Sequence, residues 1–290
     1  MEGKRTAAGE ILPSRRFFER FAPGPLLIAH RGHRACYPEN TLCAFARSLG
    51  LSRMIELDVR LSADGVAVVF HDRYLTRTSN AAQVAGELGL ASLDCGDWRL
   101  DQLQRLDLGS WFLSKDPFRT LRRGAVDRAQ LAALMPQRIL TLREVLIWAN
   151  ANRMPLNIEL KDMHVARLDG LLVPEVIREI RAAGATQQVV ISSFNHDYLR
   201  ACHQLAPEIA IAALQAGTHP PDLVRFLRSL GVCAYHPEDA ITDEALVQTL
   251  RTAGLAVNVF TVNDPDRQRQ LFGFGVTGIF TDFLEPVARG

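Results

Sequence analysis

Short apolar runs alternate with longer amphipathic stretches along most of the chain. The apolar runs predict eight strands, at Leu26–Ala29, Met54–Val59, Val66–Phe70, Leu156–Leu160, Val189–Ser192, Ile209–Ala213, Val232–Tyr235 and Leu255–Phe260. The amphipathic spacing predicts helices at Thr41–Leu49, Leu142–Asn150, Leu168–Ala183, His196–Leu205, Asp222–Leu230, Asp243–Ala253 and Asp264–Phe272. Because strand–helix alternation implies parallel strands joined by crossovers, about eight strands in roughly 250 residues predict a TIM (β/α)8 barrel.

Two stretches depart from this alternation. The chain between Asp58 and Val66 is too short for a helix, and its residues Ser62–Gly65 are typical of a tight turn. Residues 73–138 carry weak helical patterns and loop signals, which predict an insertion after the third strand. A doubly wound open sheet is the alternative fold, and it is weakened because no Gly-x-Gly-x-x-Gly follows the first strand.

Composition favours one domain. The chain has 290 residues, 48% of them hydrophobic, and no long Gly/Ser/Pro linker divides it. We therefore expect a barrel over residues 26–290, preceded by an extension over residues 1–25. The basic aromatic segment Arg15–Phe21 is expected to pack on the barrel, and peripheral contact with a membrane is the less favoured reading.

Charge and cysteine content bear on partners and location. The net charge of +1 gives no global electrostatic reason to expect nucleic acid. No apolar stretch approaches the roughly 20 residues of a membrane-spanning helix. The five cysteines include no Cys-x-x-Cys pair, which favours reduced thiols and a cytoplasmic location. The sequence leaves the oligomeric state open.

Polar residues follow several predicted strands. His30 and His71 come directly after two apolar runs, and Glu56 and Asp58 are two residues apart near the end of a third. Residues two apart in a strand point to the same face, so these two carboxylates could share one cation. Glu159 ends another strand in the same manner. An all-oxygen set of this kind selects Mg²⁺, Ca²⁺ or Mn²⁺ over zinc.

Each of these residues also has a simpler interpretation. A lone histidine after a strand is usually a polar loop residue, and Lys161 could simply pair with Glu159 or Asp162 in solvent. Asp72 could orient His71 or only form a turn, and His33 is expected to be structural. The flanking residues of Glu56 and Asp58 are apolar, so both carboxylates should be buried, where a cation would relieve the cost of burial.

Several motifs are spread along the chain: Ile28-Ala29-His30-Arg31-Gly32, Pro38-Glu39-Asn40-Thr41, Ile55-Glu56-Leu57-Asp58-Val59, Phe70-His71-Asp72 and Asn157-Ile158-Glu159-Leu160-Lys161, with later blocks at Ser193-Phe194, Thr261-Val262-Asn263 and Gly275–Asp282. By these motifs and their order, the chain resembles the glycerophosphodiester phosphodiesterase family from about Leu26 to Pro286. The resemblance implies a TIM-barrel hydrolase with one divalent ion that converts glycerophosphodiesters to sn-glycerol 3-phosphate and an alcohol. By position it implies His30 and His71 as general acid and base, Glu56, Asp58 and Glu159 as metal ligands, Arg31 and Lys161 as phosphate contacts, and Phe194 in the substrate pocket.

Two departures from the family pattern leave the substrate open. Phe260 stands where the family usually has Trp before Thr-Val-Asn, and the insertion carries Arg119, Arg122, Arg123 and Arg128. The alternatives are a lysophospholipase D-type activity, suggested by apolar residues such as Trp111, Phe112 and Phe118, and a non-catalytic binding protein. A zinc amidohydrolase is disfavoured, because that fold normally needs a His-x-His pair after its first strand.

Overall fold

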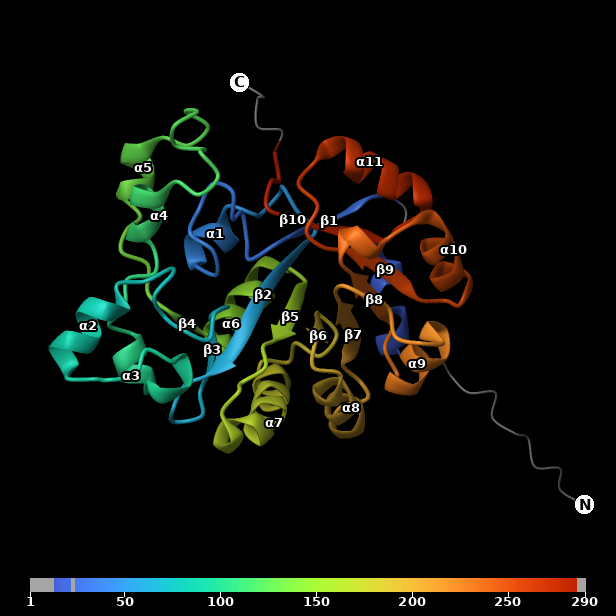
Figure 1. Ribbon diagram of the computed structural model, residues 1–290, viewed down its shortest axis with the longest axis horizontal. Coiled ribbons are helices and arrows are strands. Elements are labelled where there is room, and N and C mark those ends of the chain that lie inside the picture. Colours follow the sequence, from blue (N-terminus) through green and yellow to red (C-terminus); the bar gives the residue numbers. More distant parts are fainter. Residues whose placement is uncertain (1–12, 22–23, 286–290) are drawn as a thin grey trace, which may run out of the picture.

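Eight parallel strands close into a barrel in the computed structural model, which describes residues 13–21 and 24–285 (Figure 1). The barrel strands are β1 (Leu26–Ala29), β2 (Met54–Leu61), β5 (Leu156–Leu160), β6 (Val189–Ser193), β7 (Ala210–Gln215), β8 (Ala234–Pro237), β9 (Ala256–Val259) and β10 (Gly278–Thr281). Each strand pairs in parallel with the next, and β10 pairs with β1 to complete the circle, with Phe280 opposite Ile28. The predicted TIM barrel is confirmed.

Helices follow the barrel strands and cover its outer wall. They are α1 (Leu42–Ala46), α6 (Leu142–Asn152), α7 (Ala166–Ala182), α8 (His196–Leu205), α9 (Leu223–Leu230), α10 (Glu244–Thr252) and α11 (Pro265–Phe274). The side chains of Asp243 and Asp264 accept hydrogen bonds from main-chain N–H groups at the starts of α10 and α11. Gly231 ends α9 in the left-handed conformation, which glycine adopts without strain.

One predicted barrel strand is not part of the barrel. The run Val66–Phe70 forms β3 (Ala67–Val69), which pairs antiparallel with the end of β2 and with β4 (Leu140–Thr141). The turn at Ser62–Gly65 leaves no length for a crossover, so the chain folds straight back. The eighth barrel strand is instead β10, a segment that apolar periodicity alone did not predict as a strand.

The segment between β3 and β4 forms the predicted insertion (Figure 1). It contains α2 (Ala81–Leu88), η2 (Cys95–Asp97), α3 (Leu100–Leu103), α4 (Ser110–Lys115) and α5 (Arg128–Ala132). Part of it has a core of its own, in which Trp98 is buried with Leu75 and Leu103. The four arginines that the sequence singled out are exposed and form no ion pair within residues 13–21 and 24–285; they are Arg119, Arg122, Arg123 and Arg128.

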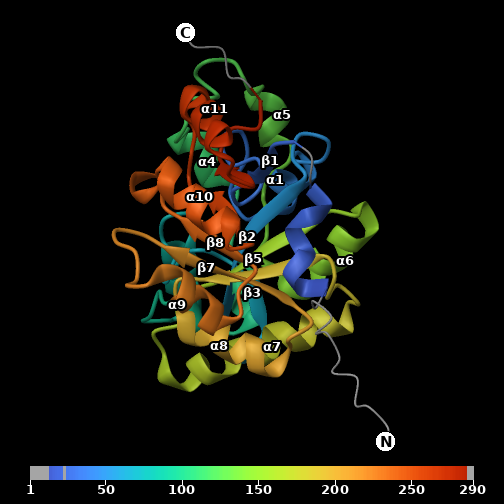
Figure 2. The same cartoon turned by 90° about the vertical axis from the view of Figure 1, so that its right-hand side faces the viewer.

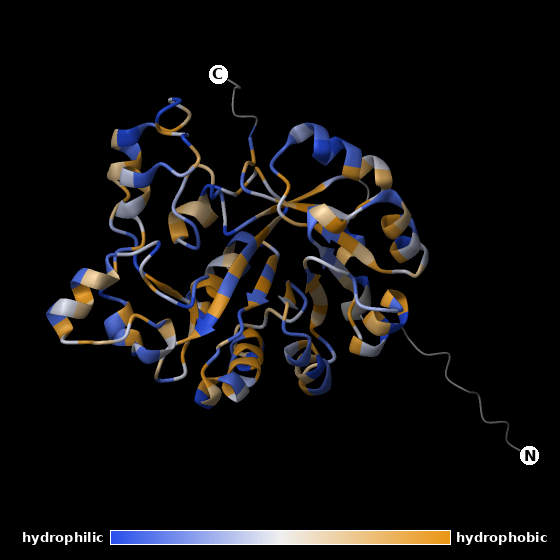
Figure 3. Ribbon diagram, viewed as in Figure 1, coloured by the Kyte–Doolittle hydropathy of each residue, from blue (hydrophilic) through white to orange (hydrophobic). Residues whose placement is uncertain are grey.

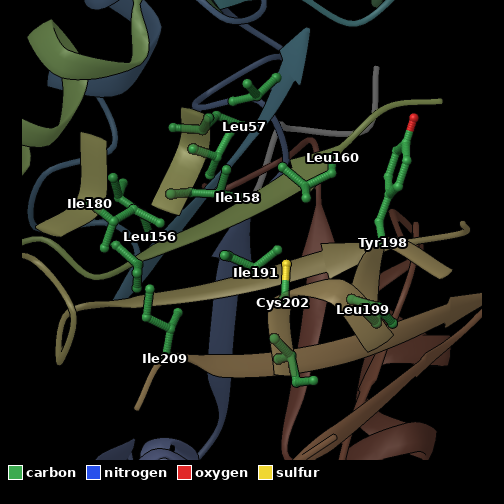
Figure 4. Packing of buried hydrophobic residues seen from close by; sticks show 14 of the residues in the cluster. Leu57, Leu156, Ile158, Leu160, Ile180, Ile191, Tyr198, Leu199, Cys202 and Ile209 are labelled. Carbon is green, nitrogen blue, oxygen red and sulfur yellow. The ribbon is translucent and has the colours of Figure 1, made fainter. Parts of the chain in front are cut away.

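Alternation along the strands divides the core into two parts. On β2, Ile55, Leu57 and Val59 face outward and pack under the helices, while Met54 points into the barrel. Hydrophobic residues accordingly concentrate on the strands and on one side of the helices (Figure 3). In Figure 4, the outward-facing Ile191 of β6 lies beside Cys202 of α8. The other positions of β2 that alternate with the outward residues are Glu56, Asp58 and Arg60, and all three are buried.

The segment η1 (Pro13–Phe21) packs beside the barrel strands, and Figure 2 shows it as the dark blue helix. Phe17, Phe18 and Phe21 are buried in the same apolar cluster as Leu26 and Ile28. The rest of the predicted extension includes residues 1–12 and 22–23, which lie outside the described residues. Within the described part of the chain, none of the helices combines the length and apolar character needed to cross a bilayer.

Candidate active site

The pairing of β2 with β5 brings three carboxylates together. Asp58 is the register partner of Glu159, and Glu56 lies two residues before Asp58 on the same inward face of β2. One oxygen from each of the three side chains lies within 4.8 Å of the others. The sequence-predicted ligand set therefore converges at one point, where the main-chain ladder between two neighbouring strands fixes the spacing.

Two buried carboxylate oxygens in this cluster lack a hydrogen-bond partner among the described residues. They are Oε1 of Glu56 and Oδ1 of Asp58. Burial, together with the charges of Asp58 and Glu159, raises the pKa of Glu56 well above its usual value. A hard divalent cation would satisfy both oxygens and offset the repulsion between the carboxylates, so these residues fit a metal ion.

Arg31 and Lys161 contact this cluster from two sides. The main-chain N–H of Arg31 donates to Oε2 of Glu56 at 2.8 Å, and its Nε lies 3.1 Å from Oδ2 of Asp58. Lys161 donates to Oε1 of Glu159 at 2.5 Å and lies 3.7 Å from Oδ1 of Asp58. Burial alone would lower the pKa of Lys161, but the two carboxylates raise it, so the ammonium is charged at neutral pH. The pair with Glu159 is formed, but it is largely buried rather than in solvent.

His30 follows β1 and is held by a carboxylate at the end of β10. Its Nδ1 lies 2.8 Å from Oδ1 of Asp282. Arg34 donates to the same Oδ1, and Asn263 donates to Oδ2 of Asp282. Burial and the charge of Arg31 lower the pKa of His30, and Asp282 counters only part of that change. Burial alone would raise the pKa of Asp282, but these hydrogen bonds hold it below its usual value.

His71 follows β3 and has a similar partner. Its Nδ1 lies 2.5 Å from Oδ1 of Asp72, so the aspartate contacts the imidazole rather than only forming a turn. Among the described residues, Nε2 of neither His30 nor His71 makes a hydrogen bond. Each imidazole is thus fixed through Nδ1, and the other ring nitrogen can still donate or accept a hydrogen bond.

Phe194 lines a cavity beside the carboxylate cluster. The cavity has a volume of about 530 Å³, and Glu159 and Lys161 also line it. The Phe194 side chain is 45% exposed and stands edge-on to Phe260 at 5.6 Å between ring centroids. Phe260, the residue that departs from the family pattern, therefore supports this wall of the cavity.

Sequence reasoning missed three contacts of the site. Asp282 holds His30, Glu39 accepts a hydrogen bond from Arg31 at 2.8 Å, and Asn40 donates to Oδ2 of Asp58 at 2.8 Å. All three residues stand in motifs that the sequence shares with the family, but the motifs do not say which groups meet. Only the closed barrel brings the end of β10 against the end of β1.

Comparison with known proteins decides the family. A sequence model of the glycerophosphoryl diester phosphodiesterase family matches residues 30–286. The chain belongs to this family. It is therefore an enzyme of the phosphoric diester hydrolase class, and the resemblance inferred from the motifs is confirmed.

Individual relatives align over most of their length. The chain is 32% identical over 268 residues to a glycerophosphodiester phosphodiesterase of Bacillus altitudinis, covering 91% of this chain and 96% of that protein. It is 33% identical over 266 residues to one of Caldanaerobacter subterraneus subsp. tengcongensis, covering 90% and 96%. A phosphodiesterase of Oleispira antarctica, solved in complex with its product sn-glycerol-3-phosphate, has a TM-score of 0.71 and 27% identity, covering 92% and 95%.

Proposed function

We propose that this phosphodiesterase hydrolyses small glycerophosphodiesters to sn-glycerol 3-phosphate and an alcohol, with one divalent cation and two histidines. The observation that carries the proposal is the set of unsatisfied oxygens on Glu56 and Asp58, which face Glu159 in a buried cluster. Burial raises the pKa of Glu159, and the neighbouring Lys161 and His71 oppose that rise, so His71 lies close enough to act electrostatically on the cluster.

The cation would be held by Glu56, Asp58 and Glu159. Oxygen ligands favour Mg²⁺ or Ca²⁺, with Mn²⁺ as a third choice. When bound there, such an ion neutralises charge on a phosphate oxygen. Arg31 and Lys161 add positive charge on the protein side, and the planar fork of an arginine suits a phosphate group.

The histidines would move the protons. One imidazole removes a proton from the nucleophile, which is water or the neighbouring glycerol hydroxyl, as the new P–O bond forms. With the glycerol hydroxyl as nucleophile the first product is a cyclic phosphodiester, and water then opens its ring in a second displacement that gives sn-glycerol 3-phosphate. The other imidazole donates its proton to the alcohol oxygen as the old P–O bond breaks. Asp282 and Asp72 hold Nδ1 of His30 and His71, so Nε2 is the nitrogen that acts in each case. Phe194 would bound the space for the substrate beside Lys161.

A coupled assay for release of sn-glycerol 3-phosphate from glycerophosphocholine tests this proposal. Chelation should abolish activity, and Mg²⁺ or Ca²⁺ should restore it. His30→Ala and His71→Ala should each lose at least about 10²-fold, while His203→Ala on the outer helix α8 should behave as the wild type. Full activity of the metal-stripped enzyme, or near-normal turnover of either histidine variant, would contradict the proposal.

The structure weakens the argument for a lysophospholipase D-type activity. Phe112 is fully buried, and Phe118 packs edge-on against Phe283 at 5.6 Å. Trp111 stands edge-on to Phe112, and Trp111 and Phe118 are half-buried. These rings take part in local packing, so their presence in the sequence is not by itself an argument for an acyl-chain site. Turnover of lysophosphatidylcholine above that of glycerophosphocholine would reverse this conclusion. A cytoplasmic location and the absence of a nucleic-acid partner stay predictions.

A further inference from the structure

Glu39 connects with the carboxylate that holds His30. Glu39 lies in the loop between β1 and α1, and Nε of Arg34 donates to its Oε2 at 2.9 Å. The same guanidinium donates through Nη1 to Oδ1 of Asp282 at 3.0 Å. Asp282 is the partner of His30, so a single arginine separates Glu39 from that pair.

Glu39 also connects with the carboxylate that holds His71. Arg77 donates to Glu39 through Nη2 at 2.6 Å and through Nη1 at 3.1 Å. It also donates to Asp72 through Nε at 2.6 Å and through Nη2 at 3.0 Å. The fork of Arg77 thus holds two carboxylates at once, and Asp72 is the partner of His71.

Glu39 is suited to such a bridge by its burial and charge. Its side chain is only 3% exposed. Burial alone would raise its pKa, but Arg31, Arg77 and Arg34 hold that pKa well below its usual value, so the carboxylate is charged at neutral pH. Hydrogen bonds between charged groups are shorter and stronger than neutral ones, and the buried side chain has little freedom to leave them.

The barrel itself does not pair the two segments that carry the histidines. His30 follows β1, which pairs with β10 and β2, whereas His71 follows β3, which pairs with the end of β2 and with β4. The contacts through Glu39 run from one imidazole to the other without using the carboxylate cluster. We define the Glu39 bridge as Arg34, Glu39 and Arg77.

We propose that Glu39 is a positioning residue that fixes His30 and His71 relative to each other through Arg34 and Arg77. This inference rests on the proposed function of the two histidines. Proton transfer needs the imidazole within about 2.6–3.2 Å of the reacting oxygen. A displacement of about 1 Å can cost about 10²-fold in rate, so a loose bridge would slow catalysis without disturbing metal binding.

The two arms can be cut separately, and the leaving group reports which proton transfer is affected. Arg34→Met cuts the arm to His30, and Arg77→Met cuts the arm to His71. Each variant is assayed with glycerophosphocholine, whose alcohol must be protonated to leave, and with glycerophospho-4-nitrophenol, whose phenolate leaves unprotonated. The variant that displaces the general acid should lose about 10²-fold with the first substrate and little with the second. The variant that displaces the base should lose about the same with both.

Matched variants and the histidines themselves complete the design. Arg73→Met and Arg47→Met are the control variants. Arg73 lies in the same loop as Arg77 but pairs with Asp94, and the Arg47 guanidinium lies over the ring of Tyr37. Both should keep the wild-type ratio of rates on the two substrates. Arg34→Met should follow the leaving-group pattern of His30→Ala, and Arg77→Met that of His71→Ala.

Folding and metal binding are measured on every variant. If Arg77→Met does not fold, Arg77→Lys replaces it, because lysine keeps the charge but cannot hold two carboxylates with a planar fork. Metal affinity should stay at the wild-type value in all variants of the bridge. The bridge alone would be overturned if the histidine variants lose activity but both arginine variants match their controls. It would also be overturned if each of the two arginine variants loses the same factor with both substrates, because neither would then displace the general acid. Histidine variants that keep activity would overturn the proposed function and the bridge with it.

Discussion

Asp58 on β2 and Glu159 on β5 occupy paired positions in the parallel register of the barrel. Their carboxylates, together with that of Glu56, therefore meet because two neighbouring strands align, and no loop sets their spacing. Asp58 is further fixed by Asn40, which donates to Oδ2 and leaves Oδ1 without a hydrogen-bond partner among the described residues.

This arrangement predicts that Asp58→Asn weakens metal binding. The substitution removes one negative charge and one anionic oxygen from the cluster, with almost no change in size. Since even residues behind a ligand typically contribute 10–100-fold to metal affinity, we expect a loss of at least about 10-fold. Calorimetric titration with Mg²⁺, Ca²⁺ and Mn²⁺ measures it, and Asp101→Asn on the exposed surface is the control. An unchanged affinity would exclude Asp58 as a ligand.

Gly32→Ala should destabilise the loop that carries His30 and Arg31. Gly32 has a φ of +84°, and an added Cβ would lie 2.8 Å from the main-chain carbon of Ala44 in α1. We expect the free energy of unfolding to fall by roughly 1–3 kcal/mol, with activity lowered as well.

Gly65→Ala is the matched control for this substitution. Gly65 has a similar φ of +80°, but an added Cβ would meet nothing within 4 Å. Urea unfolding of both variants gives their free energies of unfolding. The difference between the two losses measures the clash with α1, because the strain of a positive φ is common to both. Equal losses in the two variants would show that the close approach of Gly32 to Ala44 has no energetic weight.

The burial of His236 is expected to make the free energy of unfolding depend on pH. It is fully buried in β8 with no hydrogen-bond partner for Nδ1 among the described residues, and burial lowers its pKa to about 3. The unfolded chain binds a proton near the ordinary pKa of about 6.5, so stability is complete above that value and falls as the pH drops towards 3. The loss should approach roughly 1.4 kcal/mol per pH unit within that window.

Urea unfolding of the wild type and of His236→Gln, at about pH 7, 6 and 5, tests this dependence. The glutamine stays neutral throughout, so the difference between the two curves isolates His236 from the other histidines. The wild type should lose stability relative to the variant as the pH falls. Parallel curves would contradict the predicted pKa of the folded state.

Phe17→Ala tests whether η1 is an integral part of the barrel. The Phe17 side chain is 2% exposed and stands edge-on to Phe18 at 5.1 Å. Truncating a buried phenylalanine typically costs about 3–5 kcal/mol, which should lower the melting temperature clearly. Glu19→Ala on the exposed side of η1 is the control. A melting temperature equal to that of the control would mean that the barrel is stable without this contact.

The sequence predicts the barrel well because strand and helix periods are local properties. It fails for β3 and β10, because an apolar run such as Val66–Phe70 has the same pattern whether it joins the barrel or folds back as a hairpin. Membership of the barrel is decided by which strand pairs with which. The segment Gly278–Thr281 is short, begins with glycine and becomes a strand through its partners β1 and β9.

In the candidate site, too, local patterns were predictable and contacts between distant segments were not. Glu56, Asp58 and Glu159 were predictable because two-residue spacing and strand ends place them on one face. Asp282 was not, because it meets His30 across 252 residues of chain. Glu39 contacts Arg77 across 38 residues, and nothing in the spacing of the motifs indicates that contact.

Because β3 lies in a hairpin outside the barrel, His71 is attached to the fold differently from His30. His30 is positioned by β1 and β10, the two strands that close the barrel. His71 follows β3, which pairs with β4 outside the barrel and is connected to it by the inserted helices. Sequence change in those helices can therefore shift His71 while Glu56, Asp58 and Glu159 stay where they are. The insertion between β3 and β4 is therefore the part of the chain where sequence differences between related enzymes would change the position of His71.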